Sequence, residues 1–77
     1  MFKDIFGDSP QTKILDFLAD HPEFDYSISE IAKNSHVSRP TVYKIKDILL
    51  KKELIIKTMQ DEIQNFYINF YINYYKK

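Results

Sequence analysis

Two helix-start signals stand close together in the middle of the sequence, and no other feature constrains the fold as much. Ser27-Ile28-Ser29-Glu30 has the Ser-x-x-Glu form of a capping box, and Ser38 followed by Pro40 is a second cap with a proline in the first helical turn. The helix that starts at the capping box must therefore end near Asn34, and the chain must reverse within Ser35-His36-Val37. This arrangement predicts a helix-turn-helix.

The predicted turn contains no glycine, although a turn this tight usually needs a residue at positive φ. The whole chain has one glycine. Asn34 and His36 are the candidates for the left-handed position, because asparagine and histidine enter that region more readily than most residues. Val37 is then expected to fill the space between the two helices as an apolar plug.

The helix after Ser38 is expected to cover about residues 38–51 and to have two distinct faces. Val42, Ile45 and Leu49 recur at i, i+3 and i+7, so they line the face that packs on the core. At about 100° per residue, the opposite face is mostly polar. It carries Pro40, Tyr43, Lys44, Asp47 and Lys51, with Arg39 at its edge.

The segments on either side of the helix-turn-helix complete the fold. Ser9-Pro10 starts an earlier helix that runs to about Asp20. Leu54–Met59 is β-branched and apolar enough for a strand, Gln60–Gln64 is a polar hairpin tip, and the chain alternates again from Phe66. Three helices followed by a β-hairpin wing predict an α+β fold, mainly α, of the winged helix-turn-helix class.

The length of 77 residues predicts one domain. We expect an N-terminal segment at residues 1–8, a winged helix at residues 9–69 and an aromatic C-terminal extension at residues 70–77. The chain has no cysteine, its apolar runs are short, and its first residues lack the layout of a signal peptide. These features favour a soluble protein of the reducing cytoplasm that does not bind a membrane.

The sequence shows no sign of catalytic or cofactor chemistry. His21 and His36 have no partner at the spacing of a metal site, and no glycine-rich loop or Ser, His and Asp group stands out. We therefore expect no enzyme activity, no metal, no cofactor and no small-molecule ligand.

The net charge of zero conceals a strong asymmetry along the chain. Residues 1–30 carry two lysines against seven acidic residues, whereas residues 31–60 carry seven basic residues against Asp47 and Glu53. A basic block in the middle of the chain indicates an anionic partner at one face, although a solvated surface of alternating charge would give the same count.

With these elements in place, the chain resembles a known family, the small winged helix-turn-helix transcription regulators that are abundant in archaea. The matching stretches are IFGDSPQTKILDFL, DYSISEIAKNSHVSRPTVYK and the hairpin ending FYIN, which together span roughly residues 5–69. The segment VSRPTVYK is the most specific of them, because it resembles a recognition helix. The resemblance implies transcriptional regulation through sequence-specific binding of double-stranded DNA, with the helix of residues 38–51 in the major groove.

This placement nominates the residues that bind DNA. Ser38 and Thr41 carry short hydroxyls in the first turn, where phosphate binds, and Arg39 has the length and fork to reach a guanine. Each of these residues could also have a structural role that does not involve DNA. Ser38 could act only as a cap, and Thr41 could be half-buried. Tyr43 could cover the preceding helix, and Lys44 could be solvated surface. The full set is Ser38, Arg39, Pro40, Thr41, Tyr43, Lys44 and Lys51, with Lys33, His36 and Lys57 as candidate phosphate contacts.

Four residues depart from the family pattern. Glu53 stands where the family usually has a glycine before the first wing strand, so the helix must be closed in another way. Lys46 occupies an apolar position of the recognition helix. Asp61 and Glu62 stand at the wing tip, where a wing that contacts phosphate would carry Lys, Arg or Gly, so we expect that this wing does not grip DNA.

The C-terminal segment NFYINFYINYYKK repeats with a period of four residues, which suits a strand and, roughly, a helix. Its aromatic and β-branched residues favour the strand. The partner strand Leu54–Met59 is too short to pair with all of it, so a second subunit or the chain's own core must cover the rest. We expect a homodimer. Its interface would include Phe66, Tyr67, Ile68, Phe70, Tyr71, Ile72, Tyr74 and Tyr75.

A function of a different class is also compatible with the sequence. A winged helix can serve as a protein-interaction module in a transcription or replication assembly, because a fold does not fix a function. The acidic residues Asp61 and Glu62 and the zero net charge favour this alternative, whereas the basic block favours DNA.

Overall fold

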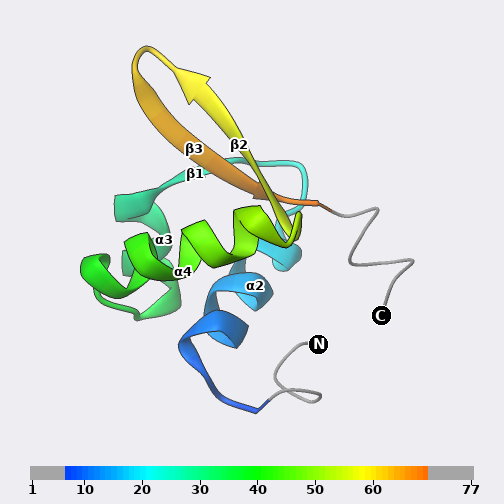
Figure 1. Ribbon diagram of the computed structural model, residues 1–77, viewed down its shortest axis with the longest axis vertical. Coiled ribbons are helices and arrows are strands. Elements are labelled where there is room, and N and C mark those ends of the chain that lie inside the picture. Colours follow the sequence, from blue (N-terminus) through cyan, green and yellow to red (C-terminus); the bar gives the residue numbers. More distant parts are fainter. Residues whose placement is uncertain (1–6, 70–77) are drawn as a thin grey trace.

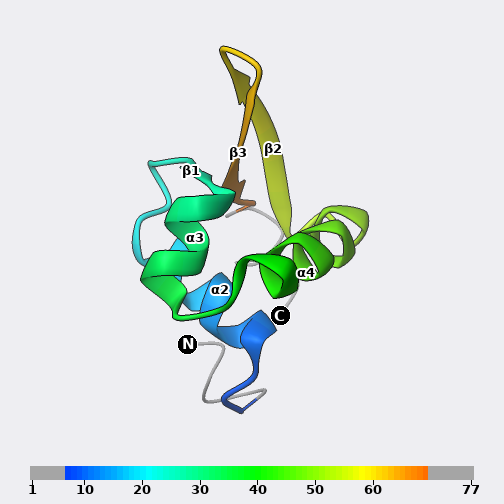
Figure 2. The ribbon, with the colours of Figure 1, turned by 90° about the vertical axis from the view of Figure 1, so that its left-hand side faces the viewer.

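The structure is a computed structural model, and residues 7–69 are described here. Figure 1 shows a β-hairpin projecting beyond three helices, and Figure 2 shows two of the helices on either side of its base. In chain order the elements are α2 (Pro10–Asp20), β1 (Tyr26–Ser27), α3 (Ile28–Ser35), α4 (Arg39–Lys51), β2 (Ile55–Gln60) and β3 (Ile63–Ile68). This architecture confirms the predicted winged helix-turn-helix, and we call the β2–β3 hairpin the wing.

A short third strand joins the wing. β1 pairs antiparallel with β3, which also pairs antiparallel with β2, so β3 is the central strand of the sheet. In this register Tyr26 lies opposite Phe66, and the ring of Tyr26 packs against Phe17 of α2 with 4.6 Å between centroids. The sequence did not predict β1, because two residues are too few to show an alternating pattern.

The wing closes in a two-residue turn. Gln60 pairs with Ile63, which leaves Asp61 and Glu62 as the turn residues, with φ angles of 52° and 69°. Two consecutive positive φ angles are typical of a type I′ turn, which suits the twist of a hairpin and favours Asn-Gly. The predicted tip was therefore too long, and β3 begins at Ile63 rather than Phe66. Because the turn contains no glycine, its position has no marker in the sequence.

α3 begins with the predicted capping box. The backbone N–H of Glu30 donates to the Ser27 hydroxyl (3.3 Å), and the backbone N–H of Ser27 donates to the Glu30 carboxylate (3.0 Å). Partial burial, and then the carboxylates of Glu23 and Glu30, raise the pKa of the adjacent Tyr26 hydroxyl. Ser27 also pairs with Asn65 of β3, so the start of α3 is attached to the wing.

The core lies between α2, the inner faces of α3 and α4, and the base of the wing. Burying an aliphatic or aromatic side chain stabilises the fold by about 1.5–3 kcal/mol, so this cluster fixes α4 and leaves its outer face free. The most deeply buried apolar side chains are Ile14, Leu18, Ile31, Val42, Phe66 and Ile68.

α4 ends without a glycine. Glu53 has a φ of 61°, and its N–H donates to the carbonyl of Leu50 (3.0 Å), while the N–H of Leu54 donates to the carbonyl of Leu49 (2.9 Å). These two hydrogen bonds form a Schellman motif, in which glutamate takes the left-handed position that glycine usually occupies. The helix is thus closed in the usual manner, with a backbone strain of about 1–2 kcal/mol at Glu53.

Candidate nucleic-acid interface

The turn between α3 and α4 has the predicted form. His36 has a φ of 58°, and the N–H of Val37 donates to the carbonyl of Ala32 (3.2 Å), which closes α3. Val37 is 8% exposed and belongs to the core cluster, which confirms its role as the plug between the helices. Histidine, rather than Asn34, takes the left-handed position, and the side chain of Asn34 instead donates to the carbonyl of Glu30 (2.8 Å).

α4 presents one face to solvent, as its periodicity predicted. Val42, Ile45 and Leu49 are buried on the inner side of the helix. Tyr43 is 54% exposed, so it does not serve as a cover for α3. The exposed residues of α4 are Arg39, Pro40, Tyr43, Lys44, Asp47 and Lys51.

The first turn of α4 carries two hydroxyls in contact. The Ser38 hydroxyl donates to the Thr41 hydroxyl oxygen (2.8 Å), and Ser38 makes no side-chain capping bond. Its backbone carbonyl still accepts from the N–H of Val42 (2.9 Å), so the residue occupies the cap position without capping through its side chain. Ser38 is exposed and Thr41 is half-buried, so this pair lies at the edge of the exposed face.

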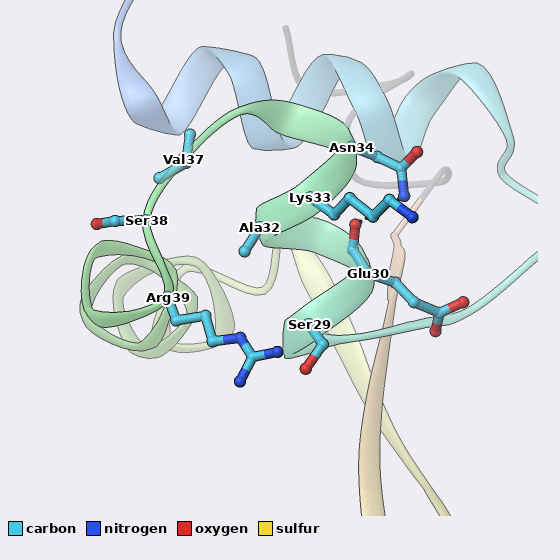
Figure 3. Close-up of a pocket in the computed structure, with 8 residues that line it drawn as sticks. All are labelled: Ser29, Glu30, Ala32, Lys33, Asn34, Val37, Ser38 and Arg39. Atoms are coloured by element: carbon cyan, nitrogen blue, oxygen red, sulfur yellow. Dashed lines mark hydrogen bonds between the residues drawn. The ribbon is translucent and has the colours of Figure 1, made fainter.

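A hollow between α3 and the start of α4 brings three of the predicted DNA-binding residues together. Lys33, Ser38 and Arg39 line it, and in Figure 3 the guanidinium of Arg39 points from the start of α4 toward Ser29 at the start of α3. Sequence reasoning missed Ser29, although its place in the capping box was a usable signal, because the first turn of a helix offers free N–H groups. Lys33, Arg39 and the hydroxyls of Ser29 and Ser38 around one hollow suit an anionic ligand, although Glu30 also borders it.

The other two candidate phosphate contacts lie elsewhere. His36 lines a different hollow, on the α2 side, together with the acidic residues Asp16 and Asp20. Lys57 is exposed on β2, opposite Phe66 of β3. Among the three residues nominated for phosphate, Lys33 is therefore the one that lines the hollow beside Arg39.

Lys46 lies at the corner where α4 meets the wing. Its side chain is 17% exposed, and its ammonium lies 3.1 Å from the Asp47 carboxylate. The ammonium is also 5.9 Å from the ring centroid of Tyr43 and 5.8 Å from that of Phe66. A lysine can bury its aliphatic stem against apolar groups while its ammonium finds polar partners. This explains how a lysine is accommodated at an apolar position of the helix.

The predicted dimer interface needs a correction. Phe66 is 0% exposed and Ile68 is 2% exposed, because both belong to the chain's own core, so neither can offer a surface to a second subunit. Tyr67, on the other face of β3, is half-buried. The remaining interface candidates, Phe70, Tyr71, Ile72, Tyr74 and Tyr75, lie outside the described residues.

Residues 7–69 contain no helix of the length and apolar character needed to span a bilayer. Within the same range, no three His, Cys, Asp or Glu side chains are grouped so that they could hold a metal ion.

Two solved structures show the same fold. MepR, a transcription regulator of the Staphylococcus aureus multidrug efflux pump MepA, has a TM-score of 0.71 and 24% identity over 79% of this chain and 46% of its own. The heme sensor protein PefR from Streptococcus agalactiae, solved in complex with heme, has a TM-score of 0.65 and 20% identity over 79% of this chain and 44% of its own. The chain thus spans less than half the length of either structure.

No curated protein matches the sequence. The model of the MarR family matches residues 8–62, which include α2, the helix-turn-helix, all of β2 and the wing tip. The match and the fold confirm the predicted winged helix-turn-helix fold, while the narrower archaeal attribution stays a prediction. The chain belongs to the MarR family.

Proposed function

We propose that this protein regulates transcription by binding double-stranded DNA, with α4 in the major groove. The observation that carries the proposal is the outer face of α4, where Arg39, Tyr43 and Lys44 are exposed on a helix whose inner face is fixed in the core. Family membership supports the same function.

The exposed residues divide into two roles by their chemistry. Arg39 can donate two parallel hydrogen bonds to a guanine, and Tyr43 can make an apolar contact with a thymine methyl group. Lys44 and Lys51 are point charges suited to phosphates, and Lys33 with Ser38 can bind a phosphate at the hollow beside Arg39. Phosphate contacts set affinity and orientation, whereas base contacts set sequence preference.

We further propose a homodimer that works in the cytoplasm. One recognition helix with a single arginine reads few base pairs, and two helices related by a two-fold axis would read half-sites about 34 Å apart or at a multiple of that distance. Phe66 and Ile68 are buried in the core, so the residues that we propose for this pairing are Tyr67 and the candidates that follow Asn69.

The rival function is a protein-interaction module, and one observation favours it. The wing tip presents Asp61 and Glu62, both exposed, where phosphate would be repelled. An interaction module would not need the exposed cations of α4.

Titration of DNA at several salt concentrations tests the proposal. The probe is a duplex selected by the protein itself from a random-sequence pool, followed by fluorescence anisotropy at low and moderate salt. We expect affinity to fall steeply with salt, and Lys44→Ala to reduce the slope of log affinity against log salt by about one. Lys13→Ala, which removes an exposed charge from α2, is the matched control and should leave the slope unchanged. If no duplex is enriched from the pool, the interaction-module function replaces this one.

A further inference from the structure

Tyr43 is the aromatic residue of α4, and its ring needs a fixed orientation if it is to read a base. The side chain is 54% exposed, and an exposed side chain samples several rotamers unless a neighbour restrains it. A side chain that is already ordered before binding loses less entropy in the complex, which strengthens the contact it makes. A neighbour that restrains Tyr43 would therefore strengthen its contact with a base and increase the preference for that base.

Lys46 is placed to supply that restraint. It follows Tyr43 by three positions, so the two side chains are neighbours on the helix surface. The ammonium of Lys46 lies 5.9 Å from the centroid of the Tyr43 ring and 5.8 Å from that of Phe66, both within the range of cation–π attraction. Phe66 is completely buried in β3, so it is a rigid anchor for the lysine. The Asp47 carboxylate, 3.1 Å from the ammonium, adds a third contact.

The same surroundings make Lys46 a poor phosphate ligand. Its side chain is 17% exposed and its ammonium already has the Asp47 carboxylate as a partner, whereas Lys44 and Lys51 are exposed. The hollow that Lys46 and Tyr43 border also contains Glu62 of the wing tip. A phosphate approaching this ammonium would therefore meet two carboxylates beside it.

We infer that Lys46 is a positioning residue, which restrains the Tyr43 ring through its cation–π contact in the orientation that α4 presents to DNA bases. Lys46 then influences base preference without contacting DNA. The inference rests on the proposed function, because it explains how Tyr43, a residue proposed to read bases, is held in place. It also links the wing to recognition, because the anchor Phe66 belongs to β3.

The test compares Lys46→Met with Tyr43→Ala in the full-length chain. Methionine keeps an unbranched apolar stem against Phe66 but has no charge, so the packing is retained while the ring contact is lost. The probes are the duplex selected by the wild-type protein and a set of its single-base-pair variants. We expect Lys46→Met to lower the preference for one base pair about two- to fivefold. Tyr43→Ala should abolish preference at the same base pair, and the double variant should resemble Tyr43→Ala alone.

Lys46→Arg and Lys44→Met are the two controls. Lys46→Arg retains a cation that stacks on aromatic rings and should keep the wild-type preference. Lys44→Met removes an exposed charge from the same helix and should weaken binding to all the duplexes alike, with a smaller salt slope. If Lys46→Met shows this uniform pattern instead, Lys46 is a phosphate contact and the inference fails. It fails equally if Lys46→Met retains the full base preference that Tyr43→Ala removes.

A measurement without DNA separates this inference from the proposed function. In the free protein, the ring protons of Tyr43, labelled with ¹³C and followed by NMR, should change chemical shift in Lys46→Met and return in Lys46→Arg. Thermal unfolding of each variant shows whether the fold is retained. Unchanged Tyr43 resonances in a folded Lys46→Met protein would refute the positioning role whether or not the protein binds DNA.

Discussion

The side-chain amide of Asn69 donates a hydrogen bond to the backbone carbonyl of Glu53, 2.9 Å away. The backbone N–H of Asn69 also donates to the carbonyl of Leu54, 3.0 Å away. The residue that follows β3 is thereby tied to the residues that end α4. The end of α4 and the end of the wing are therefore joined through the hydrogen bonds of Asn69.

Glu53→Gly should stabilise the protein. Glycine adopts a φ of 61° without the clash that Cβ causes, and the carbonyl that Asn69 uses remains in place. We expect a gain of about 0.5–1 kcal/mol in the free energy of unfolding, measured by urea denaturation, because the greater freedom of glycine in the unfolded chain offsets part of the relief. Glu53→Ala keeps Cβ and is the control. An equal gain in the alanine variant would mean that the glutamate charge, not backbone strain, is the cause.

Truncation after Asn69 should leave the winged helix folded and reduce dimerisation. The last described pair of the sheet is Ile55 with Ile68, and the hydrogen bonds of Asn69 are retained in the shortened chain. Sedimentation velocity should show a dimer for the whole chain and a shift toward monomer for the truncated one, with weaker binding to a palindromic site. A whole chain that sediments as a monomer at high concentration, with or without DNA, would contradict the proposed dimer.

Arg39 should determine preference at one base pair. Arg39→Ala is expected to cost about 1–3 kcal/mol of binding free energy with the selected duplex, and much less with a duplex altered at that base pair. Arg39→Lys retains the charge but not the planar fork, so it should lose the preference while keeping the salt slope. Anisotropy titrations with the two duplexes measure both quantities. Equal losses on both duplexes in Arg39→Ala would make Arg39 a phosphate contact instead.

The acidic wing tip should weaken DNA binding. Asp61→Asn with Glu62→Gln removes two exposed carboxylates without changing the size of the side chains. We expect affinity for duplex DNA to rise about two- to fivefold at low salt and the gain to shrink as salt screens the charges.

A matched pair of substitutions controls for net charge. Asp20→Asn with Glu23→Gln removes the same charge from exposed residues at and after the end of α2. The gain in DNA affinity should be smaller in this variant than in the wing variant, because these carboxylates lie away from the proposed DNA-binding face. Weaker binding in the wing variant would show that the carboxylates take part in the complex.

The features that the sequence predicted well are local ones. The capping box at Ser27, the left-handed His36 and the buried Val37 each depend on a few neighbouring residues. The exposed face of α4 follows from helical periodicity in the same way. The positions of Arg39 and Lys44 on that face could therefore be assigned without coordinates.

The features that the sequence missed depend on how distant segments meet. β1 exists because Tyr26 and Ser27 reach the edge of β3, and no local pattern marks two residues as a strand. The alternation of the C-terminal segment was equally compatible with an interface and with the core, and the pairing of Ile68 with Ile55 decided it. The contact between Lys46 and Phe66 joins residues 20 positions apart in the sequence, so helix periodicity could not show it.

Ser27 belongs to two structures at once, since it is a strand residue paired with Asn65 and also the cap of α3. Because the pairing with Asn65 and the two cap hydrogen bonds with Glu30 meet at one residue, a movement of β3 at this point would displace the cap, and unwinding of the first turn of α3 would displace the strand. The wing and the helix-turn-helix are thus expected to unfold as one cooperative unit rather than as separate segments. If the wing changes position when DNA binds, the start of α3 would therefore move with it.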